Sequence, residues 1–167
     1  AREIAMMATV RAQADVVINS SSYSTARLRG ELYRLFGDSQ QGGEMTVSLE
    51  SFGFKHGLPM EADLVFDVRF LPNPFYVDAL RDKTGLDAPV RDYVFSFRET
   101  EVFLDKLRDL LRFVLPLYRE EGKTVLVVAV GCTGGRHRSV AVARALAEYI
   151  GTLGYRVTET HRDMTRT

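Results

Sequence analysis

The sequence has one cysteine, no net charge and no long apolar run. A single cysteine, Cys132, in 167 residues excludes an internal disulfide framework and is typical of a reducing compartment. Lys and Arg together number 22, as do Asp and Glu, so the whole chain has no electrostatic preference for nucleic acid or anionic membrane. No window approaches the roughly 18 apolar residues of a membrane-spanning helix. We therefore expect a cytoplasmic protein without membrane contact, in which any nucleic-acid surface is a local patch.

The sequence also lacks a metal-binding pattern, an internal repeat and a low-complexity tract. No cluster of His, Cys and carboxylates has the spacing of metal ligands, so no metal site is expected. A chain of this length usually forms one domain with a substantial core. The chain begins with Ala1 rather than Met, and we expect it to be a fragment of a longer protein.

The first forty residues predict one strand, one helix and a linker. The apolar run 14–19 is typical of a strand, and a cap at Ser24 or Thr25 begins a helix that extends to Phe36. Residues 37–44, GDSQQGGE, are polar and rich in glycine, as linkers and loops are. We place a domain boundary in this linker, which divides the chain into residues 1–40 and 41–167.

The remaining residues predict an α/β domain. Segments that alternate apolar and polar residues predict half-buried strands, and a wholly apolar run predicts a strand buried on both faces. Strands are predicted over 45–50, 64–70, 125–130 and 155–160, and helices with apolar stripes over 101–118 and 139–150. The last forty residues form a right-handed parallel strand, helix, strand unit. We expect a mixed sheet with helices on both faces.

The segment GCTGGRHRS, residues 131–139, joins the predicted central strand to a helix. Open α/β sheets bind ligands at this end of their strands. The first turn of a helix has free N–H groups, and Gly134 and Gly135 let an anion approach the backbone closely. Arg138 and Ser139 add a guanidinium and a hydroxyl that suit tetrahedral oxygens. The loop therefore predicts a phosphate site, in preference to a tight turn with solvated basic side chains.

Other basic residues are weaker candidates when their spacing alone is considered. His161 and Arg162 reach the same edge of the sheet if the last strand is parallel to the central one, although a solvated strand end is an equal alternative. Arg69 ends another strand, but a simple ion pair with Asp67 competes with a ligand role. A lone histidine such as His56 is more often a packed or exposed side chain than a ligand.

The eight residues CTGGRHRS also match the C-x-x-G-x-x-R-S loop of cysteine-dependent phosphatases. A thiolate of Cys132 at a helix N-terminus beside Arg138 could attack phosphorus. Such loops usually carry a histidine before the cysteine, where this chain has Gly131. A phosphatase also needs a carboxylic general acid on a separate loop, and no pattern in the sequence supports Asp87 or Asp92 in that role. A phosphatase is therefore the alternative, and a packed, inert Cys132 is the favoured interpretation.

Four longer blocks give a more specific resemblance. They are FGFKHGLP (52–59), DVRFLPNP (67–74), TGLDAPV (84–90) and GCTGGRHRS (131–139). Together, and in this order, they resemble the C-terminal domain of the RapZ and YvcJ family. The segment ADVVINSSSYSTARLRGEL resembles the last strand and helix of that family's N-terminal P-loop kinase-like domain, whose Walker A sequence is absent here. The resemblance thus assigns residues 1–40 to the end of that domain plus a linker, and residues 41–167 to the C-terminal domain.

The resemblance implies a bacterial sensor or adapter, with no enzyme activity expected in this fragment. RapZ of enterobacteria presents a small RNA to an endoribonuclease and senses glucosamine 6-phosphate, and the fold of its C-terminal domain is similar to a phosphofructokinase sugar-phosphate domain. Because family members bind ATP or GTP on the upstream domain, no cofactor is expected here. The implied partners are a phosphorylated amino sugar, a small RNA with its endoribonuclease, and further copies of the chain in a homo-oligomer.

The motifs carry the family's site onto particular residues of this chain. The implied ligand site comprises His56, Arg69, Thr133, Gly134, Gly135, Arg136, His137, Arg138 and Ser139. We expect backbone N–H groups of the loop and Arg138 to hold the phosphate. The implied RNA surface comprises Arg136, His161, Arg162 and Arg166. The tail HRDMTRT has only two arginines, and Asp163 offsets one of them, so few phosphates would be neutralised and RNA binding stays open.

Overall fold

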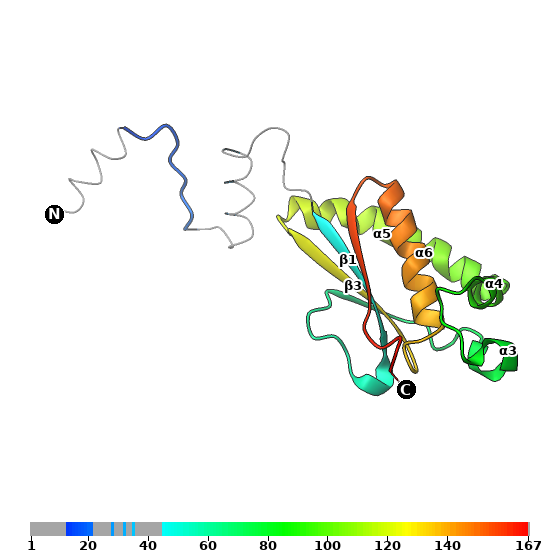
Figure 1. Cartoon of the computed structure of the whole chain (residues 1–167). Helices are drawn as coiled ribbons and strands as arrows, with labels where there is room; N and C mark the ends of the chain where they lie inside the picture. The colour runs from blue at the N-terminus through cyan, green and yellow to red at the C-terminus, as the bar shows by residue number, and fades with distance from the viewer. Residues whose placement is uncertain (1–12, 22–27, 29–31, 33–34, 36–44, 167) are drawn as a thin grey trace.

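The structure, a computed structural model, describes residues 13–21, 28, 32, 35 and 45–166 (Figure 1). Four strands form one sheet in the order β2, β3, β1, β4. Their bounds are β1 Thr46–Gly53, β2 Leu64–Asp67, β3 Val125–Cys132 and β4 Arg156–His161. The α/β class is confirmed. The expected mixed sheet is wrong for the described residues, because all the strand pairings are parallel. Each connection therefore brings the chain back to the end of the sheet at which the previous strand began.

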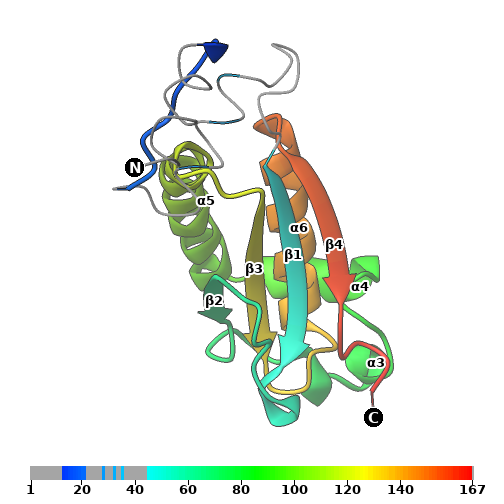
Figure 2. The same ribbon diagram turned by 90° about the vertical axis from the view of Figure 1, so that its left-hand side faces the viewer.

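The long helices lie on one face of this sheet (Figures 1 and 2). The helices are α3 Asp78–Arg81, α4 Ala88–Phe95, α5 Arg98–Glu120 and α6 Arg138–Thr152, and two short 3-10 turns are η1 Phe54–His56 and η2 Pro74–Tyr76. The expectation of helices on both faces is not met within the described ranges, because all the labelled helices lie on the same side of the sheet (Figure 2). Of the helices described, none is long and apolar enough to cross a bilayer.

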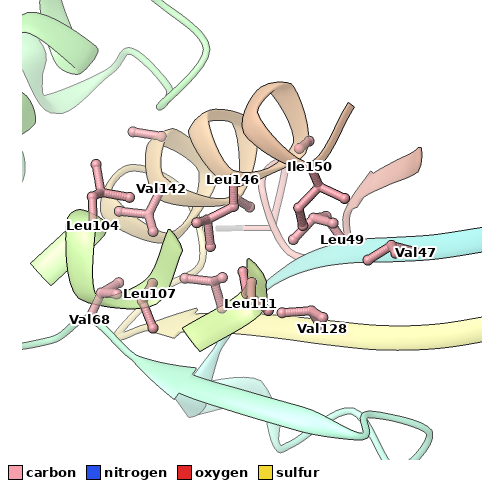
Figure 3. Packing of buried hydrophobic residues seen from close by; sticks show 14 of the residues in the cluster. Val47, Leu49, Val68, Leu104, Leu107, Leu111, Val128, Val142, Leu146 and Ile150 are labelled. Carbon is pink, nitrogen blue, oxygen red and sulfur yellow. The ribbon is translucent and has the colours of Figure 1, made fainter. Parts of the chain in front are cut away.

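The hydrophobic core lies between the sheet and the two long helices. Figure 3 shows side chains from β1 and β3 pointing toward those of α5 and α6. The residues that meet there include Val47, Leu49, Val128, Leu107, Leu111, Leu146 and Ile150, all of them buried. Because positions i, i+3 and i+4 share one face of a helix, the apolar residues of α5 and α6 form one apolar face on each helix. These two faces pack against the sheet.

The first forty residues give different outcomes for the two elements predicted there. The strand predicted at 14–19 is wrong, because these residues are irregular and Val16 and Val17 are 41% and 54% exposed. A strand needs a neighbour to bond its N–H and C=O groups, and no described segment pairs with this one. The predicted helix ending at Phe36 and the linker 37–44 lie largely outside the described residues, although residues 28, 32 and 35 are helical.

The parallel arrangement gathers the carboxyl ends of all the strands at one edge of the sheet. Gly53, Asp67, Cys132 and His161 end β1, β2, β3 and β4. The end of β1 and the loop after β3 lie in close contact, because a Cβ added at Gly53 would lie 2.6 Å from the carbonyl carbon of Gly134. This edge is where open α/β sheets bind ligands.

Candidate anion-binding site

A cleft of about 500 Å³ opens at the carboxyl edge of the sheet. Its floor is the loop between β3 and α6, from which Cys132, Thr133, Gly134, Arg136, His137 and Arg138 line the cleft. One wall comes from the segment that follows β2, and Lys55 and Arg166 complete the rim. The volume lies in the range of small-molecule sites, roughly 300 to 1,000 Å³.

Arg138 is a buried cation at the first position of α6. Only 5% of the residue is exposed, yet it lines the cleft. Its Nη1 donates to the carbonyls of Arg69 (2.7 Å) and Leu71 (2.9 Å), its Nη2 donates to Thr133 Oγ1 (3.3 Å), and its buried Nε has no partner. Among the described residues no carboxylate forms an ion pair with Arg138. Its hydrogen-bond partners are therefore neutral, although its charge also helps to lower the pKa of the nearby Asp67. A buried cation without a directly paired carboxylate favours an anion in the cleft.

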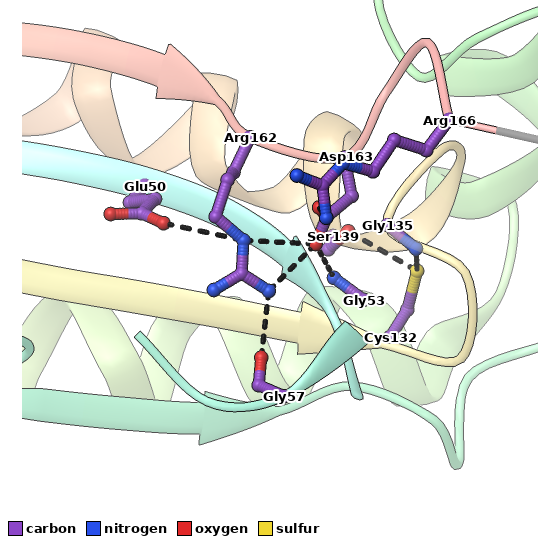
Figure 4. Close-up of polar contacts among 9 residues, drawn as sticks. All are labelled: Glu50, Gly53, Gly57, Cys132, Gly135, Ser139, Arg162, Asp163 and Arg166. Atoms are coloured by element: carbon purple, nitrogen blue, oxygen red, sulfur yellow. Dashed lines mark hydrogen bonds and ion pairs between the residues drawn. The ribbon is translucent and has the colours of Figure 1, made fainter. Parts of the chain in front are cut away.

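Two members of the predicted site, Gly135 and Ser139, contact the sulfur of Cys132 beneath the loop (Figure 4). The Gly135 N–H donates to Cys132 Sγ over 3.2 Å, and the Ser139 hydroxyl lies 3.1 Å from the same sulfur. Gly135 and Ser139 are buried and do not line the cleft. The N–H of Gly135 and the hydroxyl of Ser139 thus stabilise the loop from behind, whereas Thr133, Gly134 and Arg138 are among the loop residues that line the cleft.

The loop is fastened to the segment 69–85, which contains the cleft wall. At one end of the segment Arg138 bonds the carbonyls of Arg69 and Leu71. At the other end His137 Nε2 lies 3.2 Å from the carbonyl of Arg81, and Arg136 donates to the carbonyls of Asp82 and Lys83. Burial lowers the pKa of His137, so a neutral ring with its proton on Nε2 donates to Arg81. The side chains of Arg136 and His137 therefore set the geometry of the wall.

Arg69 and His56 lie outside the cleft lining. Arg69 forms a bidentate ion pair with Asp67, with Nη2 at 2.6 Å, and its guanidinium stacks 4.0 Å above the Phe54 ring. The hydrogen bonds from Arg69 lower the pKa of Asp67. His56 ends η1, and its buried Nε2 has no hydrogen-bond partner among the described residues. Neither side chain lines the cleft, and Arg69 contributes its carbonyl to Arg138.

The basic residues of the tail bond to acidic groups within the fold (Figure 4). Asp163, which is fully buried, accepts from Gly53 N at 2.9 Å and from Arg162 at 2.7 Å, and lies 3.3 Å from Arg166. His161 contacts Ser51 Oγ and Glu159 Oε1, each at 2.8 Å. Of these cations only Arg166 lines the cleft, where it is 57% exposed. The tail therefore forms part of the fold's own ion-pair network.

Six residues of the cleft lining were not predicted from the sequence: Lys55, Asn73, Phe75, Tyr76, Arg81 and Asp82. Lys55 and Asn73 belong to quoted blocks, so those blocks carried a usable signal. Phe75 and Tyr76, which follow Pro74, form no sequence motif that predicts a site, because their exposure depends on how the surrounding loop folds. The phosphatase candidates Asp87 and Asp92 do not line the cleft, and Asp87 instead accepts from the Thr84 N–H and hydroxyl. Within the described ranges no group of three His, Cys, Asp or Glu could hold a metal ion.

Comparison with known proteins agrees with the blocks quoted above. Residues 45–165 match the family model described as the RapZ C-terminal domain. A nucleotide-binding protein of Carboxydothermus hydrogenoformans is 47% identical over 163 residues, which cover 98% of this chain and 56% of that protein. A nucleotide-binding protein of Staphylococcus epidermidis is 49% identical over 158 residues, which cover 94% of this chain and 52% of that protein. The chain spans about half the length of the curated relatives it matches. It therefore belongs to the RapZ C-terminal domain family.

Proposed function

We propose that this chain is a non-catalytic sensor or adapter domain that binds a phosphorylated amino sugar in the cleft above Arg138. The observation that carries the proposal is a buried guanidinium whose partners are carbonyls and a hydroxyl, with no carboxylate paired to it among the described residues. Such a cation can form an ion pair with a bound anion. It lies in the first turn of α6, where free N–H groups add to the positive potential.

The other charges of the cleft support the same ligand class. Lys55, Arg81, Arg136 and Arg166 line the cleft with Arg138, whereas Asp82 is the one acidic residue of the lining among the residues that the structure describes. A phosphate suits the first group, and a single carboxylate suits the ammonium of an amino sugar. Gly134 leaves room for the ligand, because a Cβ added there would meet only Lys55 Cε, at 3.9 Å. RNA is not part of this proposal, since Arg136, His161 and Arg162 are bonded within the fold.

Replacing Arg138 by alanine is expected to weaken binding of glucosamine 6-phosphate roughly ten- to hundredfold. The reason is the loss of a charge-assisted contact of about 1.5 to 3 kcal/mol. Calorimetric titration with glucosamine 6-phosphate measures this, with glucosamine and inorganic phosphate as control ligands. Because Arg138 also bonds Arg69 and Leu71, thermal unfolding must first show that the variant is folded. Arg138→Lys keeps the charge, so its affinity for glucosamine 6-phosphate should lie between those of the unmodified chain and Arg138→Ala. Equal affinity in a folded Arg138→Ala protein would contradict the proposal.

A cysteine phosphatase is the alternative, because the Cys132 sulfur lies within the loop and accepts the Gly135 N–H. Cys132 lines the cleft but is only 2% exposed, and this low exposure argues against attack of its sulfur on a substrate. We expect no hydrolysis of an aryl phosphate by the chain, and we expect Cys132→Ser to keep its ligand affinity. Turnover that disappears in Cys132→Ser would replace the sensor by an enzyme.

A further inference from the structure

We propose that the same cleft accepts nucleoside 5′-monophosphates, with the base against Phe75 and Tyr76 and the phosphate at Arg138. The proposal rests on the phosphate site described above and adds an aromatic subsite to it. Both aromatic residues line the cleft, and they are 50% and 80% exposed. Large aromatic side chains that stay exposed beside a cationic pocket favour a ligand with a flat ring. Every nucleobase has a flat face that can stack on an aromatic side chain, whatever its hydrogen-bonding groups.

The aromatic subsite differs from the other exposed aromatic residues of the chain. Phe70 is 61% exposed but packs edge-on against Phe103, with ring centroids 5.0 Å apart. Phe113 is 69% exposed on α5 and does not line the cleft. Phe75 and Tyr76 instead meet at 79°, with centroids 5.9 Å apart, so their rings form two differently oriented surfaces at the cleft. This pair is therefore placed for a ligand that also reaches the loop.

Hydrogen bonds hold the aromatic subsite at a fixed place relative to the loop. Arg81 Nε donates to the Phe75 carbonyl over 3.2 Å, and the Arg81 carbonyl in turn contacts His137 Nε2. Asn73 caps η2 by accepting the Phe75 N–H, and its neighbour Leu71 is held by Arg138. The phosphate end and the base end of the cleft are thus joined through main-chain groups. A site preorganised in this way loses little entropy when it binds.

The charged groups around the rings suit a nucleobase. The Arg81 guanidinium lies 5.4 Å from the centre of the Phe75 ring, and guanidinium planes stack on bases as aromatic rings do. Asp82 also lines the cleft, and a carboxylate can accept a hydrogen bond from an exocyclic amino group. An adenine base offers both a stacking face and such an amino group. We therefore take AMP as the probe.

The test compares AMP with ribose 5-phosphate, which has the same phosphate and sugar but no base. By titration calorimetry, AMP is expected to bind roughly five- to hundredfold more tightly, as stacking on aromatic side chains provides. The Phe75→Leu, Tyr76→Leu double variant should lose this advantage and keep its affinity for ribose 5-phosphate. Phe113→Leu, which changes an exposed aromatic elsewhere, should behave as the unmodified chain.

Two results would overturn the aromatic subsite. One is equal affinity of the unmodified chain for AMP and ribose 5-phosphate, and the other is an AMP advantage that survives in the double variant. Either result leaves the proposed phosphate site standing, provided that the sugar phosphates bind the chain and that Arg138→Ala weakens their binding. If no phosphorylated compound binds the folded chain, the phosphate site fails and the subsite fails with it.

A final comparison separates a free nucleotide from the end of an RNA chain, since both present a base and a 5′-phosphate. A triribonucleotide of adenosine with a 5′-phosphate is titrated beside AMP. We expect AMP to bind at least as tightly, because the cleft volume of about 500 Å³ matches one small ligand. Clearly tighter binding of the triribonucleotide would overturn the assignment to a free nucleotide in favour of an RNA end.

Discussion

Replacing Gly135 by alanine is expected to destabilise the fold by about 3 kcal/mol or more and to abolish ligand binding, for two reasons that add. Gly135 has φ +78°, a left-handed conformation that costs a residue with a Cβ roughly 1 to 2 kcal/mol. An added Cβ would also lie 2.7 Å from Gly53 N and 2.9 Å from Asp163 Cβ. Neither neighbour is the end of a flexible side chain, so the loop itself must move.

Gly154→Ala is the matched control for this variant. Gly154 has φ +85°, so the backbone strain is the same, but a Cβ added there meets nothing within 4 Å. We expect it to cost only about 1 to 2 kcal/mol and to leave ligand affinity unchanged. Urea denaturation gives both free energies of unfolding. Equal destabilisation by the two substitutions would show that the close contact of the loop with Gly53 and Asp163 adds nothing to stability.

Asp163→Ala is expected to cost about 2 to 4 kcal/mol, because it leaves the buried Gly53 N–H unpaired and removes the ion pair of the partly exposed Arg162. Asp163 is 0% exposed and accepts hydrogen bonds from the Gly53 N–H and from two nitrogens of Arg162. Its removal leaves that N–H unpaired and removes the closer partner of Arg162, whose Nε lies 3.9 Å from Glu50. Asp163→Asn keeps the shape and an acceptor for Gly53, so its cost should be smaller. Denaturation of the three proteins at neutral pH measures these differences, and a cost below 1 kcal/mol for alanine would contradict this role.

The same carboxylate predicts an acid limit to stability. Burial alone would raise the pKa of Asp163, but the hydrogen bonds from Arg162 and Gly53 lower it below its ordinary value. A lowered pKa in the folded state contributes stability that is complete above the unfolded value of about 4 and is lost as the pH falls through the folded value. Burial raises the pKa of Glu50, which acts in the opposite direction. The measure is therefore the stability difference between the unmodified chain and Asp163→Asn, which should be constant from pH 5 to 7 and shrink below about pH 4.

Much of the fold could be predicted because local pattern and final environment agree in its central unit. The apolar run at 125–130 became β3, and the stripe at 139–150 became α6 over Arg138–Thr152. The pattern could not give the direction of every strand, because alternation is the same in parallel and antiparallel pairs. It also could not show that Val16 and Val17 lack a described partner strand, since a strand depends on neighbours that a local window does not contain.

For the site, position was easier to predict than role. The glycine loop lies where its flanking strand and helix place it, and Thr133, Gly134 and Arg138 reach the cleft. That the Gly135 N–H serves Cys132, or that Arg69 stacks on Phe54, depends on tertiary contacts that spacing does not encode. The amino-sugar phosphate, the small RNA, the endoribonuclease and the homo-oligomer implied by the resemblance stay predictions, as does the division at residue 40.

The fastening of the segment 69–85 has a consequence for how the family can diversify. Every anchor that Arg136, His137 and Arg138 use on this segment is a main-chain carbonyl, and a carbonyl is supplied by any amino acid. Substitution of Phe75 or Tyr76 therefore changes the lining of the cleft without removing an anchor. Descendants of one ancestral domain can thus change this part of the cleft wall through one or two point mutations, while inheriting the glycine loop and its support unchanged.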